Sequence, residues 1–306
     1  MAQIDLHMHS SFSLDGELSP RDLAEECSRA GITLASLTDH NSVEGVSEFS
    51  WRCAQLGIRA IPGVELDCIL DTLHLHVLGY GVDVANAALL RLERSVQNMQ
   101  RQCAEAQMDA VESLGILFDR EQVLEHSKNG MIAAEMIAEA ALAEPINQKH
   151  KLLQPLFPGG DLSDQPLVNF YWELCAPGKP AYVPIHFISA EDAVCMIHEA
   201  GGIAVLAHPG ANIGADRDML SGVLQLPLDG IEAFSSYHNA LITAFYLEEA
   251  KERGLLVTAG TDFHGNTKPN VKIGDIDILN MEESLQEELF CALETSCGYE
   301  RNGEYT

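Results

Sequence analysis

The chain has 306 residues, of which 46% are hydrophobic, so it is long enough for one large α/β domain or for a barrel with an inserted module. Its 18 basic and 46 acidic residues give a formal net charge of −28, which disfavours docking on nucleic acid through a broad basic surface. The sequence contains no run of eighteen apolar residues and no basic stretch leading into an apolar run near Met1, so we expect neither a membrane span nor a secretory signal.

Short apolar runs that predict β-strands occur over the first 80 residues and again after residue 200. They cover 4–6, 34–37, 58–64, 73–78, 203–207, the residues around Ile231, and 255–259. Capping residues mark the helices between them: Ser19 and Pro20 begin one that stops at Gly31, Ser189 with Asp192 begins another that ends at Gly201, and a third covers 239–253 before Gly254. This strand–helix alternation predicts a mostly parallel sheet, open or closed into a barrel.

Residues 86–150 differ from the rest, because they are rich in Ala, Glu and Gln, have helical periodicity and contain few strand formers. A stretch punctuated by Pro and Gly follows, from Pro155 to Pro180. We therefore expect a discontinuous barrel made of 1–85 and 185–285, a mainly helical insertion at 86–184, and a C-terminal helix or tail at 286–306.

The eight cysteines are scattered along the chain, and no two of them form a C-x-x-C pair. Such spacing suits neither a zinc ribbon nor a redox motif. Reduced thiols and a cytoplasmic location are the simplest expectation.

Apolar runs repeatedly finish with a histidine or a carboxylate. The residues are His7, His9, Asp39, His40, Glu65, His208, Glu232, Asp262 and His264. In a parallel barrel the C-terminal ends of the strands meet on one face, where such proteins keep their active sites. Only imidazole and carboxylate donors occur in this set, which suits Mn²⁺, Zn²⁺ or Fe²⁺, and their number fits two or three ions better than one.

Several segments carry a resemblance to a known family. They are 5–10, 13–16, 37–40, 62–65, 76–80, 178–184, 207–209, 230–232 and 260–264. Together they resemble the PHP (polymerase and histidinol phosphatase) superfamily, and within it the stand-alone phosphoesterases that act on nucleotides or on short RNA 5′ ends. The similarity covers roughly residues 1–80 and 178–270, with the insertion in the expected place.

The resemblance implies a distorted (β/α)₇ barrel and a ligand set. It implies that one ion is held by His7, His9, Glu65 and Asp262, that Glu65 bridges to a second ion completed by His76 and His208, and that Asp15, His40 and His264 hold a third. Asp39 is then expected as a hydrogen-bond partner of a ligand rather than as a ligand. Of the alternating pair His74 and His76, we expect His74 to be a bystander.

The expected mechanism is in-line attack on phosphorus by a hydroxide that bridges two cations. His238, which follows Tyr237, is the candidate for contacting phosphate or protonating the leaving group. Relatives of this type carry an Arg and a His near the start of an insertion helix that touch the substrate phosphate, but 129–134 contains neither here. Lys179 is the expected substitute, with Arg217, Lys268 and Lys272 as further candidates.

The sequence therefore predicts a metal-dependent phosphoric ester hydrolase acting on phosphate monoesters or diesters of nucleotides or short oligonucleotides. The expected partner is a small phosphorylated substrate, with no membrane and no stably bound duplex nucleic acid. An amidohydrolase-like C–N hydrolase is an alternative, since such enzymes also open with H-x-H on a barrel strand. A non-catalytic, metal-stabilised binding module is another. The Asp39–His40 pair and the 262–264 segment favour phosphoesters.

Overall fold

The computed structural model describes residues 4–128, 130–184 and 186–276. The chain divides into two compact units, one made of Met1–Glu93 with Phe187–Thr306 and the other of Arg94–His186. The predicted insertion at 86–184 contains most of the second unit. The predicted C-terminal helix or tail at 286–306 lies outside the described residues.

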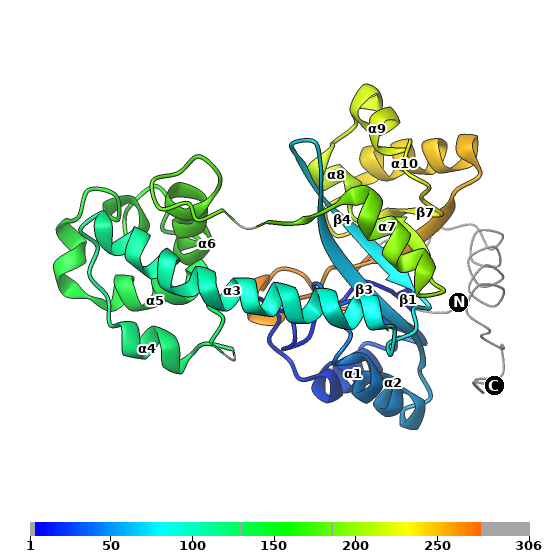
Figure 1. Cartoon of the computed structure of the whole chain (residues 1–306), viewed down its shortest axis with the longest axis horizontal. Helices are drawn as coiled ribbons and strands as arrows, with labels where there is room; N and C mark the ends of the chain where they lie inside the picture. The colour runs from blue at the N-terminus through cyan, green and yellow to red at the C-terminus, as the bar shows by residue number, and fades with distance from the viewer. Residues whose placement is uncertain (1–3, 129, 185, 277–306) are drawn as a thin grey trace. The chain divides into compact units, whose positions relative to one another are not determined.

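The first unit is built on an eight-stranded sheet (Figure 1). Its strands are β1 (Ile4–Asp5), β2 (Leu34–Leu37), β3 (Arg59–Leu70), β4 (Leu73–Tyr80), β5 (Ile188–Ser189), β6 (Ile203–Leu206), β7 (Gly230–Ser235) and β8 (Leu256–Gly260). They are ordered β1-β2-β3-β4-β6-β7-β8, and β5 pairs with β3. The backbone N–H of Leu6 donates to the Ala259 carbonyl at 3.0 Å, which joins the two ends of the sheet. The predicted distorted, mostly parallel barrel is confirmed.

One strand runs against the direction of the others. β4 pairs antiparallel with both β3 and β6, whereas every other named pair in the sheet is parallel. The reversal follows from the short connection at Asp71, because adjacent strands joined by a tight turn must be antiparallel. His76 consequently lies inside the β3–β4 hairpin, in register with Asp67, and does not follow a strand end.

Capping positions fix the helices where the sequence predicts them. Ser19 accepts a hydrogen bond from Asp22 N at the start of α1 (Pro20–Arg29), and Ser189 accepts one from Asp192 N at the start of α7 (Ala190–Glu199). α10 (Ala240–Arg253) ends at Gly254, which has a φ of 66°. These three helix predictions are confirmed. The other helices of this unit are α2 (Val46–Gln55), α8 (Pro209–Asn212), α9 (Arg217–Val223) and the short 3₁₀ helix η4 (Gly265–Thr267).

Two apolar layers hold the barrel together. The interior is filled from several strands by the buried residues Ile4, Leu6, Leu34, Ile61, Leu78, Tyr80, Ile203, Val205 and Ala207. The Tyr80 hydroxyl within this layer donates to the Leu6 carbonyl at 3.0 Å. A second layer joins α1 and α2 to the sheet (Figure 1) and includes Met8, Leu23, Leu37 and Phe49. The site described below therefore rests on a rigid, close-packed support.

The second unit is mainly helical. It contains most of α3 (Ala87–Ser113), then α4 (Arg120–Glu125), α5 (Ala134–Ala143), η1 (Pro145–Lys149), η2 (Gln154–Leu156), α6 (Pro166–Phe170) and the π-helical turn η3 (Tyr171–Cys175). Its own core includes Met108, Val111, Ile137, Phe170 and Leu174. No helix in the described part of the chain combines the length and hydropathy that crossing a membrane requires.

Candidate metal centre

Histidines and carboxylates from distant segments converge at one end of the barrel. We call the following residues the His–carboxylate cluster: His7, His9, Asp15, His40, Glu65, Asp67, His76, His208, Asp262 and His264. His7 and His9 come directly after β1, and the alternation of an extended chain puts both rings on the same side. Met8 between them points the other way, into the layer under α1 and α2.

Glu65 lies at the centre of the cluster and is fully buried. Its Oε2 atom is 3.2 Å from His7 Nε2, 3.1 Å from His9 Nε2 and 3.3 Å from His40 Nδ1. Its Oε1 atom is 2.9 Å from His76 Nδ1 and 3.3 Å from His208 Nε2. The two oxygens of one carboxylate thus face two different groups of imidazoles.

Asp262 adds a second buried carboxylate beside His7 and His9. Its Oδ1 atom lies 3.3 Å from His7 Nε2 and 3.0 Å from His9 Nε2. Its Oδ2 atom accepts hydrogen bonds from the Tyr237 hydroxyl at 2.7 Å and from the Lys268 ammonium at 2.5 Å. Asp262 has a φ of 57°, a left-handed conformation that is strained for a residue other than glycine and is common at functional sites.

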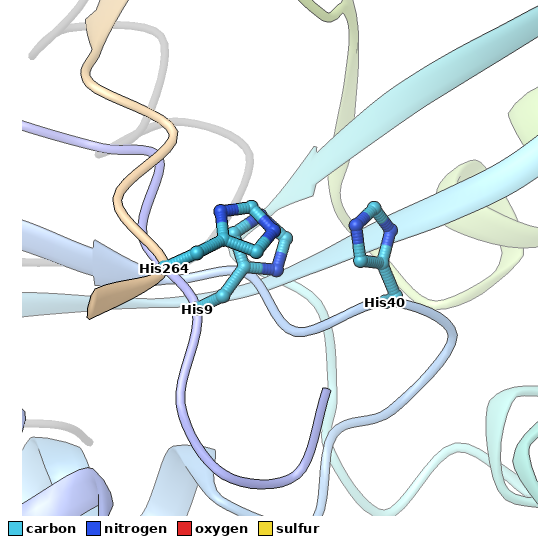
Figure 2. Close-up of side chains that lie close together, drawn as sticks. All are labelled: His9, His40 and His264. Carbon is cyan, nitrogen blue, oxygen red and sulfur yellow. The ribbon is translucent and has the colours of Figure 1, made fainter. Parts of the chain in front are cut away.

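A third group lies on the side of Asp15. His264 Nε2 is 3.1 Å from Asp15 Oδ2. Figure 2 shows the rings of His9 and His264 lying against each other, with His40 beside them; the ring centroids are 4.0 Å apart for His9 and His264 and 4.4 Å apart for His9 and His40. Burial and the neighbouring His9 lower the pKa of the His264 imidazole, which favours the neutral form in which histidine is a metal ligand.

Hydrogen bonds around the cluster hold its rings in place. His7 Nδ1 is 3.0 Å from Glu232 Oε1, and the other oxygen of Glu232 accepts from the His208 backbone N–H at 2.8 Å. His9 Nδ1 is 3.0 Å from Ser13 Oγ, and that hydroxyl donates to Asp39 at 2.8 Å. Both rings therefore turn their Nε2 atoms toward Glu65 and Asp262, which is the arrangement seen around metal-ligating histidines.

Gly260 permits the close approach of β8 to this region. A Cβ atom at position 260 would lie 2.1 Å from the Cβ atom of His7 and 2.6 Å from Glu232 Oε1. Any side chain there would displace His7 from Glu65, so the position requires glycine.

The cluster has the donors that divalent cations need. Thirteen buried side-chain N or O atoms lack a hydrogen-bond partner in the described part of the chain, and nine of them belong to the cluster. They are His7 Nε2, His9 Nε2, Asp15 Oδ1, His40 Nδ1, both oxygens of Glu65, Asp67 Oδ1, Asp262 Oδ1 and His264 Nε2. Unpaired buried polar atoms are costly, and here they point at one another. Imidazole and carboxylate donors of this kind fit bound divalent cations.

The electrostatics of the cluster also favour a bound positive charge. Burial opposes protonation of His7, yet the charges of Glu65, Glu232 and Asp262 raise the pKa of this imidazole well above its usual value. Burial likewise opposes ionisation of Glu65, but the surrounding histidines hold its pKa well below the usual range. The buried carboxylates that raise the pKa of His7 also give the cluster a negative potential that attracts cations.

All of the predicted ligands are brought together in the cluster, and His74 is not among them. His74 is exposed, and its ring packs edge-on against Phe187 with the centroids 5.2 Å apart. Asp67 is in the cluster but was not predicted from the sequence. The sequence could have revealed it, because Asp67 stands two residues after Glu65 on β3 and therefore lies on the same face of the sheet as Glu65.

Both ring nitrogens of His238, the predicted phosphate contact or acid for the leaving group, bind the backbone. Its Nδ1 atom is 2.9 Å from the Ala233 carbonyl, and its Nε2 atom accepts from the Gly210 backbone N–H at 2.9 Å. Burial lowers the pKa of the ring, consistent with a neutral imidazole. Because both nitrogens bind the backbone, a role as a phosphate contact or as the acid for the leaving group would require one of these hydrogen bonds to break. His238 thereby links Gly210, which follows β6, to Ala233 within β7.

The predicted substrate contacts outside the cluster have other partners. Lys179 Nζ is 3.3 Å from Glu173 within the second unit. The Arg217 guanidinium pairs with Glu248 and Glu249. Of the basic candidates from the sequence, Lys268 is the one whose side chain contacts a member of the cluster in the described structure.

The sequence of the chain is similar to those of known proteins. The sequence profile of the PHP domain matches residues 5–155. The chain is 30% identical over 286 residues to the 3′,5′-nucleoside bisphosphate phosphatase of Chromobacterium violaceum, a match that covers 91% of this chain and 93% of that protein. It is 28% identical over 266 residues to the phosphoribosyl 1,2-cyclic phosphate 1,2-diphosphodiesterase of Eggerthella lenta, covering 85% of this chain and 94% of that protein.

A solved structure shows the same fold. It is described as an amidohydrolase from Chromobacterium violaceum with bound sulfate and no metal, and it matches 93% of this chain and 97% of its own with a TM-score of 0.75 at 27% identity. The similarity to the first relative extends over nearly the full length of both chains and agrees with the motifs. The resemblance predicted from the sequence is therefore confirmed, and the chain belongs to the PHP domain family.

Proposed function

We propose that this chain is a metal-dependent phosphoesterase that hydrolyses phosphate monoesters or diesters of nucleotides or short oligonucleotides. The observation that carries the proposal is the position of Glu65, whose two oxygens each face a separate group of imidazoles. A carboxylate shared in this way suits two neighbouring cations, the arrangement that phosphoester hydrolysis uses. The similar proteins named for a nucleoside bisphosphate and for a phosphoribosyl cyclic phosphate support this substrate class.

The residues would divide the work as follows. His7, His9, Glu65 and Asp262 form one group of donors, and Glu65, His76 and His208 form a second. The third proposed group is His40 and His264, whose donor atoms lie close together, with Asp15, which contacts His264. Divalent cations bound there acidify water and offset the negative charge of phosphoryl oxygens. Glu65 sets the spacing between the first two groups, because its short carboxylate spans both. Glu232 and Ser13 hold the rings of His7 and His9, so the donors are already oriented before substrate arrives.

Lys268 is the proposed protein contact to the substrate phosphate. Its ammonium lies 2.5 Å from Asp262 Oδ2 and 2.7 Å from the Tyr237 hydroxyl, and its side chain is 29% exposed. An ammonium has three N–H donors, so one remains after these two bonds. Burial opposes the charge, but Asp262 raises the pKa of Lys268, so the ammonium stays protonated. Lys268 can thus supply the positive charge that 129–134 lacks.

We expect Lys268→Met to raise KM for a nucleotide substrate by about tenfold or more, because a charged hydrogen bond to phosphate is lost. The content of bound metal should stay unchanged. Initial rates over a range of substrate concentrations separate KM from kcat, and metal analysis of the purified variant tests the second point. Lys272→Met, at an exposed lysine nearby in the sequence, is the control. A Lys268→Met protein with the wild-type KM would contradict this contact.

The function is tested by a phosphate-release screen with Mn²⁺ over nucleoside bisphosphates, short oligoribonucleotides and sugar phosphates. We expect turnover of at least one phosphorylated class and none of a parallel set of amide substrates. Cleavage of amides alone would support the C–N hydrolase reading instead, and binding without turnover would support a non-catalytic module. The proposal includes two or three bound divalent cations, which are Mn²⁺, Zn²⁺ or Fe²⁺, and a cytoplasmic location.

A further inference from the structure

We propose that Asp67 is an additional ligand of the metal centre, which binds one of the cations together with His40. Asp67 belongs to the same cluster on which the proposed function rests, but its proposed role concerns the binding of a cation and not catalysis. Asp67 stands opposite His76 in the β3–β4 hairpin and on the same face of β3 as Glu65.

The side chain is held so that one oxygen points at the cluster. Oδ2 accepts a hydrogen bond from Asn41 Nδ2 at 2.7 Å, and the backbone N–H of Asp67 donates to Asn41 Oδ1 at 3.1 Å. Asn41 has a φ of 53°, a left-handed conformation that asparagine tolerates better than most residues. This reciprocal pair fixes the carboxylate and leaves Oδ1 facing the imidazoles.

The Oδ1 atom of Asp67 lies close to two imidazoles of the cluster. It lies 2.8 Å from His40 Nδ1 and 3.4 Å from His76 Nε2. Neither Asp67 Oδ1 nor His40 Nδ1 has a hydrogen-bond partner, although both are shielded from solvent. These two atoms lie 2.8 Å apart, and a cation bound between them would satisfy the lone pairs of both.

An alternative role for Asp67 would be to orient His76 by accepting its Nε2–H. The contact to His76 is the longer of the two, and it does not account for the shorter contact to His40. The donors His40, Asp67 and His76 also lie close enough together to bind one ion. The geometry therefore favours direct ligation, in which the added charge of a carboxylate strengthens cation binding.

The test measures metal binding rather than turnover. Purified protein is stripped with a chelator and titrated with Co²⁺, whose visible absorption reports its ligands, and the bound metal is counted by elemental analysis after dialysis. We expect Asp67→Asn to lose one ion per chain or to bind its weakest ion at least about tenfold less tightly, with an altered spectrum. We expect Asp67→Ser to show the same loss of metal binding as Asp67→Asn. Two variants are used so that poor folding of one of them does not prevent the test.

Asp71→Asn is the matched control, because it removes an exposed carboxylate from the turn of the same hairpin and asparagine tolerates the φ of 55° there. Asp67 variants with wild-type stoichiometry, affinity and Co²⁺ spectrum would overturn the proposal. A wild-type protein that binds Co²⁺ through Asp67 but hydrolyses no phosphate ester would overturn the proposed function and leave this inference intact.

Discussion

Glu65→Gln should lower the rate of phosphoester hydrolysis by at least about a hundredfold, the largest loss expected from a single change in the cluster. The glutamine keeps the size of the side chain but removes its charge and replaces one oxygen by an amide that donates. One of the two imidazole groups around Glu65 would then face N–H hydrogens at the distances, 2.9 to 3.3 Å, where an acceptor now lies. The spacing between the two donor groups would be lost with it.

His74→Asn serves as the control for this experiment, because His74 is an exposed imidazole on the same hairpin that contacts no cluster residue in the described structure. We expect the rate to change by less than about twofold, as for most surface substitutions. The measurement is the initial rate on the best substrate from the screen, together with the metal content of each variant. Equal losses in the two variants would show that Glu65 is not the shared ligand.

Local signals in the sequence were sufficient to predict much of the fold. Ser19, Ser189 and Gly254 mark helix ends through hydrogen bonds or a φ that depend on a few neighbouring residues. The apolar runs before His7, Asp39 and His208 mark strands, and the ends of parallel strands must meet on one face. These rules predict that residues far apart in the sequence lie close together, even when the contacts between them are not known.

The remaining features depend on contacts between segments far apart in the chain. His76 joins the cluster because β4 is antiparallel, so the rule that ligands follow strand ends does not reach it. The backbone partners of His238 come from Ala233 and from Gly210, 28 residues away, and no local pattern reveals that both its nitrogens are occupied. Asp67 could have been found by strand alternation from Glu65, but its approach to His40 depends on the anchor at Asn41.

Removal of metal by a chelator should abolish hydrolysis, and Mn²⁺ should restore it. The charges explain why the loss should be complete: a phosphate ester is anionic, and the cluster without cations presents Asp15, Glu65, Asp67 and Asp262 to it. The chain as a whole, at −28, adds to this repulsion. Protonation of His7, whose pKa the surrounding carboxylates raise, offsets part of this charge but provides no site for phosphoryl oxygens.

The same treatment should lower thermal stability, which gives a readout independent of turnover. Cations that bind only the folded chain at 100 times their Kd stabilise it by about 2.7 kcal/mol, and for a domain of this size each kcal/mol shifts Tm by about 2–4 °C. We therefore expect the metal-free protein to melt several degrees lower and Mn²⁺ to reverse the shift. Full activity in protein shown by elemental analysis to be metal-free would refute the mechanism. The buried atoms of Glu65 and its neighbours that lack hydrogen-bond partners would then need another explanation.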